Sequence, residues 1–212
     1  MSFVESASAL WSPEVSASYV PLVATPRSRL RLHCDGDGAR AEVEQFIAGV
    51  YRRHFAARLT HFMPVLVSRS IDGCTCAAAG YRSAVDPLFL ERYLPAPIEQ
   101  MLAKATGQTI ARETVVEVGQ FASQCAGEGR RLMPELARHL VDSGFRWAVL
   151  TATADLRRLL RHQGLAAMPL GTAQRRCVGG EARLWGSYYR HTPKVLAGDL
   201  VANLARLQRG RR

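Results

Sequence analysis

The sequence predicts one α/β domain with a mixed β-sheet flanked by helices. In its first half, short apolar runs at 63–69 and 74–81 are joined by Ser70-Ile71-Asp72-Gly73, and an Asp-Gly step between such runs favours a β-hairpin. In its second half, strand-like and helix-like segments alternate, which predicts a β-α-β-α unit whose two strands run parallel. An antiparallel hairpin followed by a parallel unit gives a mixed sheet.

The remaining elements follow from local periodicity. Residues 28–33 alternate polar and apolar side chains, which suits a half-buried strand, and residues 42–59 carry apolar side chains at helical spacing. A short turn at 87–93 and a helix at 98–106 come next. From residue 113 four elements are expected, namely a strand at 114–118, a helix at 132–143, a strand at 147–152 and a helix at 155–162.

Length and composition favour one folded unit. The chain has 212 residues, of which 48% are hydrophobic and 22% charged, while single domains typically run about 100–200 residues. We expect a partly ordered arm at 1–27, the domain at 28–205 and a basic tail at 206–212. Charged residues interrupt every apolar run before the roughly 18–20 residues that a membrane span needs. No transmembrane segment is predicted.

Several features favour a cytoplasmic protein. Glu5 and Pro13 break the pattern of a secretion signal, and the odd count of five cysteines fits a reducing compartment. Cys74-x-Cys76 has no second cysteine pair and no histidine pair nearby, so it is interpreted as structural and no metal site is expected. The N-terminal arm could pack against a second copy, so an oligomer is one expectation that the sequence leaves open.

The net charge of +10, from 28 Lys and Arg against 18 Asp and Glu, attracts polyanions. Nucleic acid, anionic lipid, a phosphopantetheine cofactor and an acidic carrier protein all fit such a charge, and so does a merely solvated basic surface. No helix-turn-helix, zinc-finger or aromatic-basic strand motif accompanies it, so nucleic acid is not the expected partner.

A glycine-containing loop lies between the strand near 121 and the helix near 132. It reads Gln124-Cys125-Ala126-Gly127-Glu128-Gly129, followed by Arg130 and Arg131. Glycines allow the backbone close to a ligand, and amides at a helix N-terminus bind phosphate. The loop therefore either holds a pyrophosphate or is an ordinary strand-to-helix connection.

Two other segments carry functional side chains. Glu117 on an inner strand could deprotonate an amine if burial raised its pKa, or it could instead pair with Arg82. The aromatic segment Trp185-Gly186-Ser187-Tyr188-Tyr189 suits a bent strand that packs on the sheet, although Tyr188 or Tyr189 could also serve as a general acid. No nucleophile-histidine pattern is evident, which favours direct transfer without a covalent enzyme intermediate.

These motifs resemble known families. The Gln-x-x-Gly-x-Gly spacing, in its strand-loop-helix position, resembles the GNAT acetyltransferases, in which the loop holds the pyrophosphate of the cofactor. Glu117 and Phe121 match the Glu-x-x-Arg-Phe strand of acyl-homoserine-lactone synthases, with Gln120 in place of the Arg. The synthases' paired Asp residues and Trp, which help to bind S-adenosylmethionine, are missing here. A different amine acceptor is therefore expected.

The chain over 40–204 is most similar to the thermostable hemolysin family. That resemblance is carried by Phe55-x-x-x-Leu59, the segment 87–94, Val115-Val116-Glu117-Val118-Gly119, the segment 145–153 and Trp185-Gly186-Ser187-Tyr188-Tyr189. Together the resemblances imply a GNAT-like mixed sheet and an N-acyltransferase. Its acyl donor would be an acyl-phosphopantetheine co-substrate, carried on coenzyme A or on an acyl carrier protein, and its acceptor a small amine or amino acid. No permanently bound cofactor is expected. A membrane-active hemolysin and a non-catalytic GNAT-like binding module are the alternatives.

The resemblances also suggest roles for individual residues. A backbone amide near Gln120 to Ala122 would stabilise the oxyanion. The expected catalytic residues are Glu117, Gln120 and Tyr188. The expected co-substrate-binding residues are Phe121, Ala122, Gln124, Gly127, Gly129, Arg130 and Arg131. The expected acceptor-binding residues are Arg53, Phe55, Arg82, Trp147 and Thr151.

Overall fold

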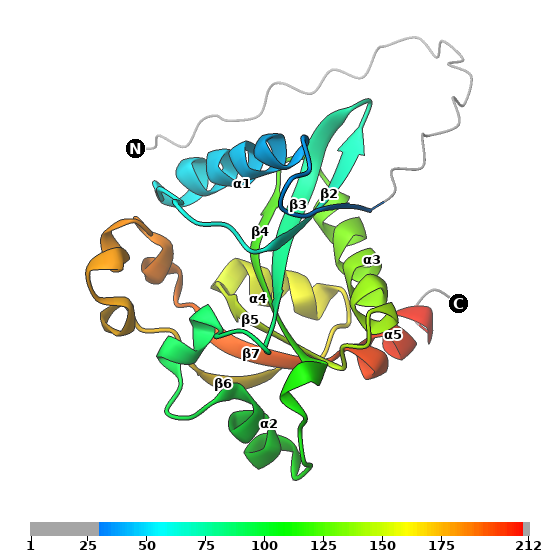
Figure 1. Ribbon diagram of the computed structural model, residues 1–212, viewed down its shortest axis with the longest axis vertical. Helices are drawn as coiled ribbons and strands as arrows, with labels where there is room; N and C mark the ends of the chain where they lie inside the picture. The colour runs from blue at the N-terminus through cyan, green and yellow to red at the C-terminus, as the bar shows by residue number, and fades with distance from the viewer. Residues whose placement is uncertain (1–29, 210–212) are drawn as a thin grey trace, which may run out of the picture.

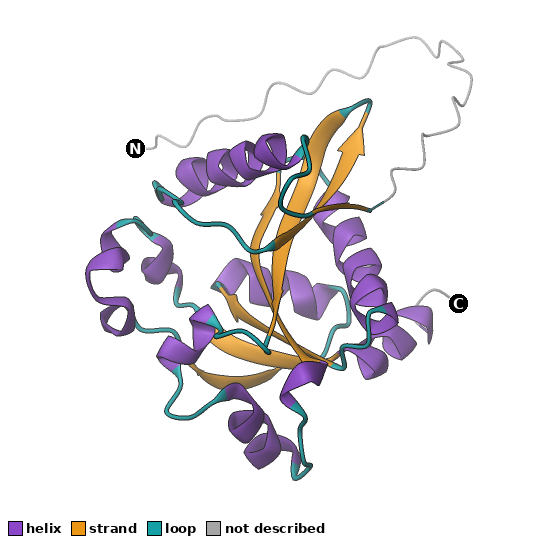
Figure 2. Cartoon of the chain, in the orientation of Figure 1, coloured by secondary structure: helices purple, strands orange, loops and turns teal. Residues whose placement is uncertain are grey.

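The computed structural model describes residues 30–209, and these residues form a seven-stranded mixed sheet in the order β1-β2-β3-β4-β5-β7-β6 (Figures 1 and 2). The strands are β1 (Arg31–His33), β2 (Val65–Ile71), β3 (Cys74–Ser83), β4 (Val115–Ser123), β5 (Trp147–Ala152), β6 (Met168–Thr172) and β7 (Lys194–Asp199). β4 and β5 are parallel, and every other neighbouring pair is antiparallel. The predicted mixed sheet, its hairpin and its parallel pair are confirmed.

Helices cover both faces of this sheet. The α-helices are α1 (Arg40–Phe55), α2 (Ile98–Thr106), α3 (Glu128–Asp142), α4 (Ala154–His162) and α5 (Leu200–Arg209). The 3-10 helices are η1 (Phe89–Tyr93), η2 (Arg112–Thr114), η3 (Arg175–Arg183) and η4 (Tyr188–His191). α1 begins two residues before the expected 42 and ends four residues before the expected 59, where Ala56 adopts a left-handed φ of 53°.

Alternation along the strands separates the two faces. Leu66 and Ala78 pack in one core with α1, whereas their sequence neighbours Val67 and Ala77 pack in another core with α3. Side chains of successive strand residues point to opposite faces, so α1 and α3 must lie on opposite sides of β2–β4, as Figure 1 shows. A third core joins α2 and η1 to β5 and β7, and it includes Trp147.

The aromatic segment after residue 184 is not a strand, and the prediction of a bent strand there was wrong. Its backbone bonds to the end of α1 instead: Ser187 N donates to Phe55 O at 2.7 Å, and Arg58 N donates to Leu184 O at 2.7 Å. Gly186 has a φ of +52°, and a Cβ atom there would lie 2.0 Å from Phe55 O. Glycine is required because no larger residue fits this crossing. Its aromatic side chains pack in the core with α1, which is the packing role first expected from the sequence.

Sequence reasoning missed β6, β7 and α5, and it started α3 four residues late. The predicted arm at 1–27 lies outside the described residues. Of the predicted tail at 206–212, residues 206–209 form the end of α5 and the rest lies outside the description. Between residues 30 and 209 no helix has the length and apolar character to cross a bilayer.

Candidate active site

The central feature of the site is a gap between β4 and β5. The two strands pair only from Val115 opposite Trp147 to Glu117 opposite Val149, although β4 continues to Ser123 and β5 to Ala152. On its other side β4 carries one extra residue relative to β3, and Gln120 in this bulge has a positive φ of 54°. A bulge bends its strand and increases the local twist, so it helps to direct β4 away from β5.

A polar cleft opens on the α1 side of this gap. It has a volume of about 430 Å³ and is bounded by α1, the 58–63 loop, η1 and the aromatic segment after residue 184. Arg58, Arg82 and Glu117 contribute charged groups to it, and Phe89 and Trp185 contribute aromatic walls. Both its size and its mixed lining are typical of small-molecule sites.

A second, apolar cavity lies on the opposite side of the sheet. Its volume is about 170 Å³, and leucines from α3, α4 and α5, among them Leu136, Leu156 and Leu200, form its walls. Both cavities are bordered by Tyr51, Thr151, Tyr188 and residues 118–120. The polar cleft and the apolar cavity therefore meet where β4 and β5 separate, which gives two compartments with one junction.

Glu117 is the buried acidic group of the polar cleft. Only 4% of its surface is exposed, and its carboxylate accepts N–H bonds from Phe89 at 2.9 Å and Leu90 at 3.2 Å. Burial raises the pKa of Glu117 to about 7, against the opposing effect of these two amides and the nearby Arg82 charge. The carboxyl group therefore exchanges its proton near neutral pH, as a general base must.

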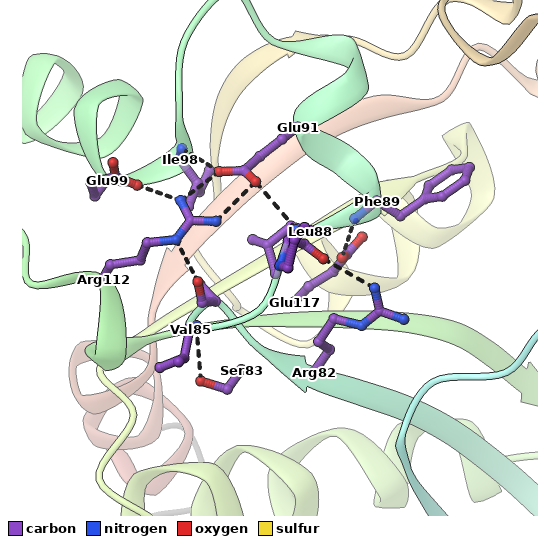
Figure 3. Close-up of polar contacts among 12 residues, drawn as sticks. Arg82, Ser83, Val85, Leu88, Phe89, Glu91, Ile98, Glu99, Arg112 and Glu117 are labelled. Carbon is purple, nitrogen blue, oxygen red and sulfur yellow. Dashed lines mark hydrogen bonds and ion pairs between the residues drawn. The ribbon is translucent and has the colours of Figure 1, made fainter.

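A charged network fixes the segment that contacts Glu117 (Figure 3). Arg112 binds both carboxylate oxygens of Glu91, at 2.6 and 2.9 Å, and one oxygen of Glu99 at 2.6 Å. Glu91 in turn accepts the amides of Leu88 and Ile98, at the starts of η1 and α2. Hydrogen bonds from Arg112, which outweigh burial, hold the pKa of Glu91 below its usual range.

The expected phosphate loop occupies the turn between β4 and α3. Gly127 precedes α3 with a φ of +82°, a conformation that favours glycine, and Gly129 lies so close to β4 that a Cβ atom would be 3.2 Å from Ser123 Cβ. In the first turn of α3, Glu128 N donates to Cys125 O at 3.2 Å and Arg131 N donates to Gly127 O at 3.1 Å, whereas the amides of Gly129 and Arg130 have no backbone acceptor among the described residues. Of the other residues expected here, Phe121 lines the apolar cavity and Ala122 is buried against α1. Gln124 is exposed, and its backbone N–H donates to Cys76 O.

The two arginines after this loop differ in their surroundings. Both are exposed, but Arg131 donates to Glu128 at 2.6 Å, whereas Arg130 forms no ion pair among the described residues. Glu128 is fully buried and also accepts from Arg69 at 2.9 Å. Burial opposes its ionisation, but the two arginines outweigh that effect and lower the pKa of Glu128. α3 begins at Glu128, four residues before the predicted start, because the pairing with Arg69 on β2 fixes Glu128 against the sheet as the first residue of the helix.

The other two predicted catalytic residues have partners within the fold. The side-chain amide of Gln120 accepts from Met63 N at 2.9 Å and donates to His61 O at 2.8 Å, so it holds the 58–63 loop over the cleft. The Tyr188 hydroxyl donates to Thr151 O at 3.1 Å at the junction of the cavities, and burial raises the pKa of Tyr188.

The expected acceptor-binding residues are not all at the site. Arg82 lines the polar cleft, Phe55 lines the apolar cavity, and Thr151 borders both, with a buried hydroxyl that has no hydrogen-bond partner among the described residues. Arg53 is exposed and lines neither cavity, because helical periodicity turns Tyr51 and Phe55 inward and Arg53 outward. Trp147 is buried in the core beneath α2 and η1 and also lines neither cavity.

Sequence reasoning missed Tyr51, Arg58, Phe89, Glu91 and Arg112 as parts of the site. Glu91 and Phe89 lie in the 87–94 segment, which was noted for its family resemblance without a role for either side chain. The described residues hold no group of three or more His, Cys, Asp or Glu side chains placed to bind a metal.

The fold matches those of known acyltransferases. FeeM, an N-acyl amino acid synthase from uncultured soil microbes, superposes with a TM-score of 0.59 at 11% identity, over 88% of this chain and 97% of its own. The CoA-dependent acyl-homoserine lactone synthase MesI gives 0.55 at 12% identity, over 86% and 94%. The acyl-homoserine lactone synthase LasI gives 0.54 at 13% identity, over 82% and 91%.

These structures define the class of the fold as the GNAT-like mixed sheet that the sequence predicted. The family follows from the sequence itself, because the thermostable hemolysin model matches residues 34–204. This chain belongs to the thermostable hemolysin family. No curated protein sequence matches it.

Proposed function

We propose that this protein is an N-acyltransferase that moves an acyl group from a phosphopantetheine thioester, carried on coenzyme A or an acyl carrier protein, to a small amine or amino acid. The observation that carries the proposal is the meeting of two chemically different cavities at the β4–β5 gap. One is apolar and suits an acyl chain, and the other is polar and contains a buried carboxyl group. The GNAT-like fold of the structural neighbours supports it.

The apolar cavity is the proposed site for the acyl chain. At about 170 Å³ it is close in size to engineered apolar cavities of about 150 Å³ that bind benzene. It opens toward the bulge at Gln120, where the thioester carbonyl would lie against the backbone amides of 120–122. An amide aimed at the developing oxyanion contributes roughly 3–4 kcal/mol in other enzymes.

The phosphates of the donor would lie at the start of α3. Gly127, Gly129 and the exposed Arg130 provide backbone amides and positive charge there. Gln163 Nε2 donates to Arg130 O at 3.4 Å. This carbonyl has no donor within α3, because the residue four positions later is Pro134, which lacks a backbone N–H. This contact brings the end of α4, with exposed Arg161, beside the phosphate loop. The two arginines would attract coenzyme A or an acidic carrier.

The reaction needs one proton acceptor and one leaving group. The free amine would attack the thioester carbonyl carbon, forming the C–N bond, and the C–S bond would then break to release the thiol. The carboxylate form of Glu117 would take the proton that the amine loses. Tyr188 is the proposed proton donor to the thiolate, which requires its hydroxyl to leave Thr151 O.

The test is product analysis by mass spectrometry. Purified protein is incubated with acyl-CoA and acyl-carrier thioesters together with pooled amino acids and amines. We expect an N-acyl product and an equal amount of free thiol. Thioester that stays intact with every acceptor would refute the proposal. Donor choice is read from which class of thioester is consumed. Binding of either anionic donor by surface arginines should weaken as ionic strength rises.

A further inference from the structure

The inference rests on the proposed acyl transfer and concerns the acceptor. We infer that the acceptor is an α-amino acid with a free carboxylate and an apolar or aromatic side chain, and that Arg82 binds its carboxylate while Glu117 receives its amine.

The spacing of Arg82 and Glu117 fits an α-amino acid. The two residues are direct cross-strand partners on β3 and β4, and both line the polar cleft. Directly opposite residues in an antiparallel pair have Cβ atoms about 4.5–5.5 Å apart and point to the same face. Figure 3 shows the Arg82 guanidinium beside the Glu117 carboxylate. An α-amino acid carries its amine and carboxylate on one carbon, so it needs an anion-binding and an amine-binding group this close together.

Arg82 has donors to spare. The only side-chain hydrogen bond of Arg82 within the described residues runs from Nη1 to Pro87 O at 3.0 Å, and no carboxylate of those residues forms an ion pair with it. Arg92 in the same cleft differs, because it already pairs with Glu181 at 2.7 Å. A guanidinium has five donors in a planar fork that matches a carboxylate.

Aromatic rings also line the same cleft. The rings of Phe89 and Trp185 lie 5.6 Å apart between centroids, and those of Trp185 and Tyr188 lie 5.3 Å apart. All three rings line the polar cleft. An acceptor anchored at Arg82 and Glu117 would place its side chain against these rings, which favours phenylalanine-like and leucine-like side chains over charged ones.

The experiment compares amino acids with their decarboxylated amines. Thiol release and N-acyl product are measured for phenylalanine against phenethylamine and for leucine against isopentylamine, with one acyl thioester. Hydrogen bonds to charged groups contribute about 1.5–3 kcal/mol, so we expect kcat/KM to favour each amino acid by about 10- to 100-fold. In Arg82→Gln this preference should collapse, mainly through a higher KM for the amino acid, and Arg82→Lys should restore part of it.

The control is Arg206→Gln, which removes an exposed charge from α5 outside both cavities and should leave the preference intact. The inference is overturned if amines react as well as amino acids, or if Arg82→Gln lowers both rates equally. In both cases acyl transfer itself still stands. If neither class of acceptor consumes thioester, the proposed function fails, and the inference fails with it.

Discussion

Replacing Glu117 by Gln should remove a pH dependence of stability that the buried carboxyl group causes, and it also removes the proposed base. The side chain is 4% exposed, and its pKa of about 7 compares with 4.5 for an ordinary Glu. A glutamine has the same shape but only one acceptor oxygen, so it can keep the amide of Phe89 or that of Leu90 while its NH2 group faces the other. This lost hydrogen bond does not depend on pH, so the pH dependence of the difference between the two proteins reports the charge alone.

The direction of this pH dependence follows from proton linkage. Because the pKa of Glu117 is higher in the folded state than in the unfolded state, the stability it contributes is fully present below pH 4.5 and is lost as pH rises through about 7. A shift of about 2.5 units corresponds to roughly 3 kcal/mol. The free energy of unfolding of wild type, relative to the variant, should fall by about that amount between pH 4.5 and 8.

The assay is urea unfolding of both proteins at several pH values. Titration of all other groups largely cancels in the difference between them. Glu113→Gln, which removes an exposed carboxylate from the same stretch of chain, controls for loss of charge alone and should show no such trend. A difference that stays flat from pH 4.5 to 8 would mean that folding does not raise the pKa of Glu117. The assignment of Glu117 as a base near neutrality would then be wrong.

Four further predictions follow from the same contacts. Glu117→Gln should lower kcat/KM for acyl transfer by about 10²- to 10⁴-fold, and the wild-type rate should rise with pH through about 7; a pH-independent rate would count against the base. Gly186→Ala should lower the free energy of unfolding, measured with urea, by about 3 kcal/mol or more, because the added Cβ would clash with Phe55 O. An unchanged unfolding midpoint would contradict the close contact between residue 186 and the end of α1. Arg112→Gln should lower the free energy of unfolding by about 2 kcal/mol. This is less than the roughly 3–5 kcal/mol lost when one partner of a fully buried ion pair is removed, because the network is partly exposed; a variant as stable as wild type would show that the network does not stabilise the fold. Purified protein should release no dye from anionic liposomes, and rapid leakage would instead favour the membrane-active alternative.

Local sequence pattern anticipated the elements that carry Glu117 and Arg82. Both residues lie on strands with clear apolar runs, and Asp72-Gly73 fixes the hairpin to which β3 belongs. What the pattern could not show is the register that makes the two residues direct partners, because register depends on the bulge at Gln120. The choice between base and ion-pair partner for Glu117 therefore needed the structure.

Other features depend on contacts between distant residues. The prediction of a strand at 185–189 was wrong because aromatic content favours strands, whereas the backbone of this segment bonds to the end of α1, more than a hundred positions earlier in the sequence. The late start assigned to α3 has a similar cause, since Glu128 pairs with Arg69 on β2. The two cavities are formed by side chains from residue 51 to residue 203, so no local window could predict them.

The most direct test of the account is thioester turnover by wild type and Gly127→Asp, followed as free thiol and N-acyl product. An Asp at the start of α3 would place a negative charge where the donor phosphates are proposed to lie. Gly73→Asp is the matched control, because Gly73 has a φ of +80° against +82° at Gly127 and both have open space around them. The account predicts product with wild type and Gly73→Asp and a large loss with Gly127→Asp. Equal turnover by all three would contradict the phosphate site, and no turnover by any of them would contradict acyl transfer and favour a non-catalytic binding module.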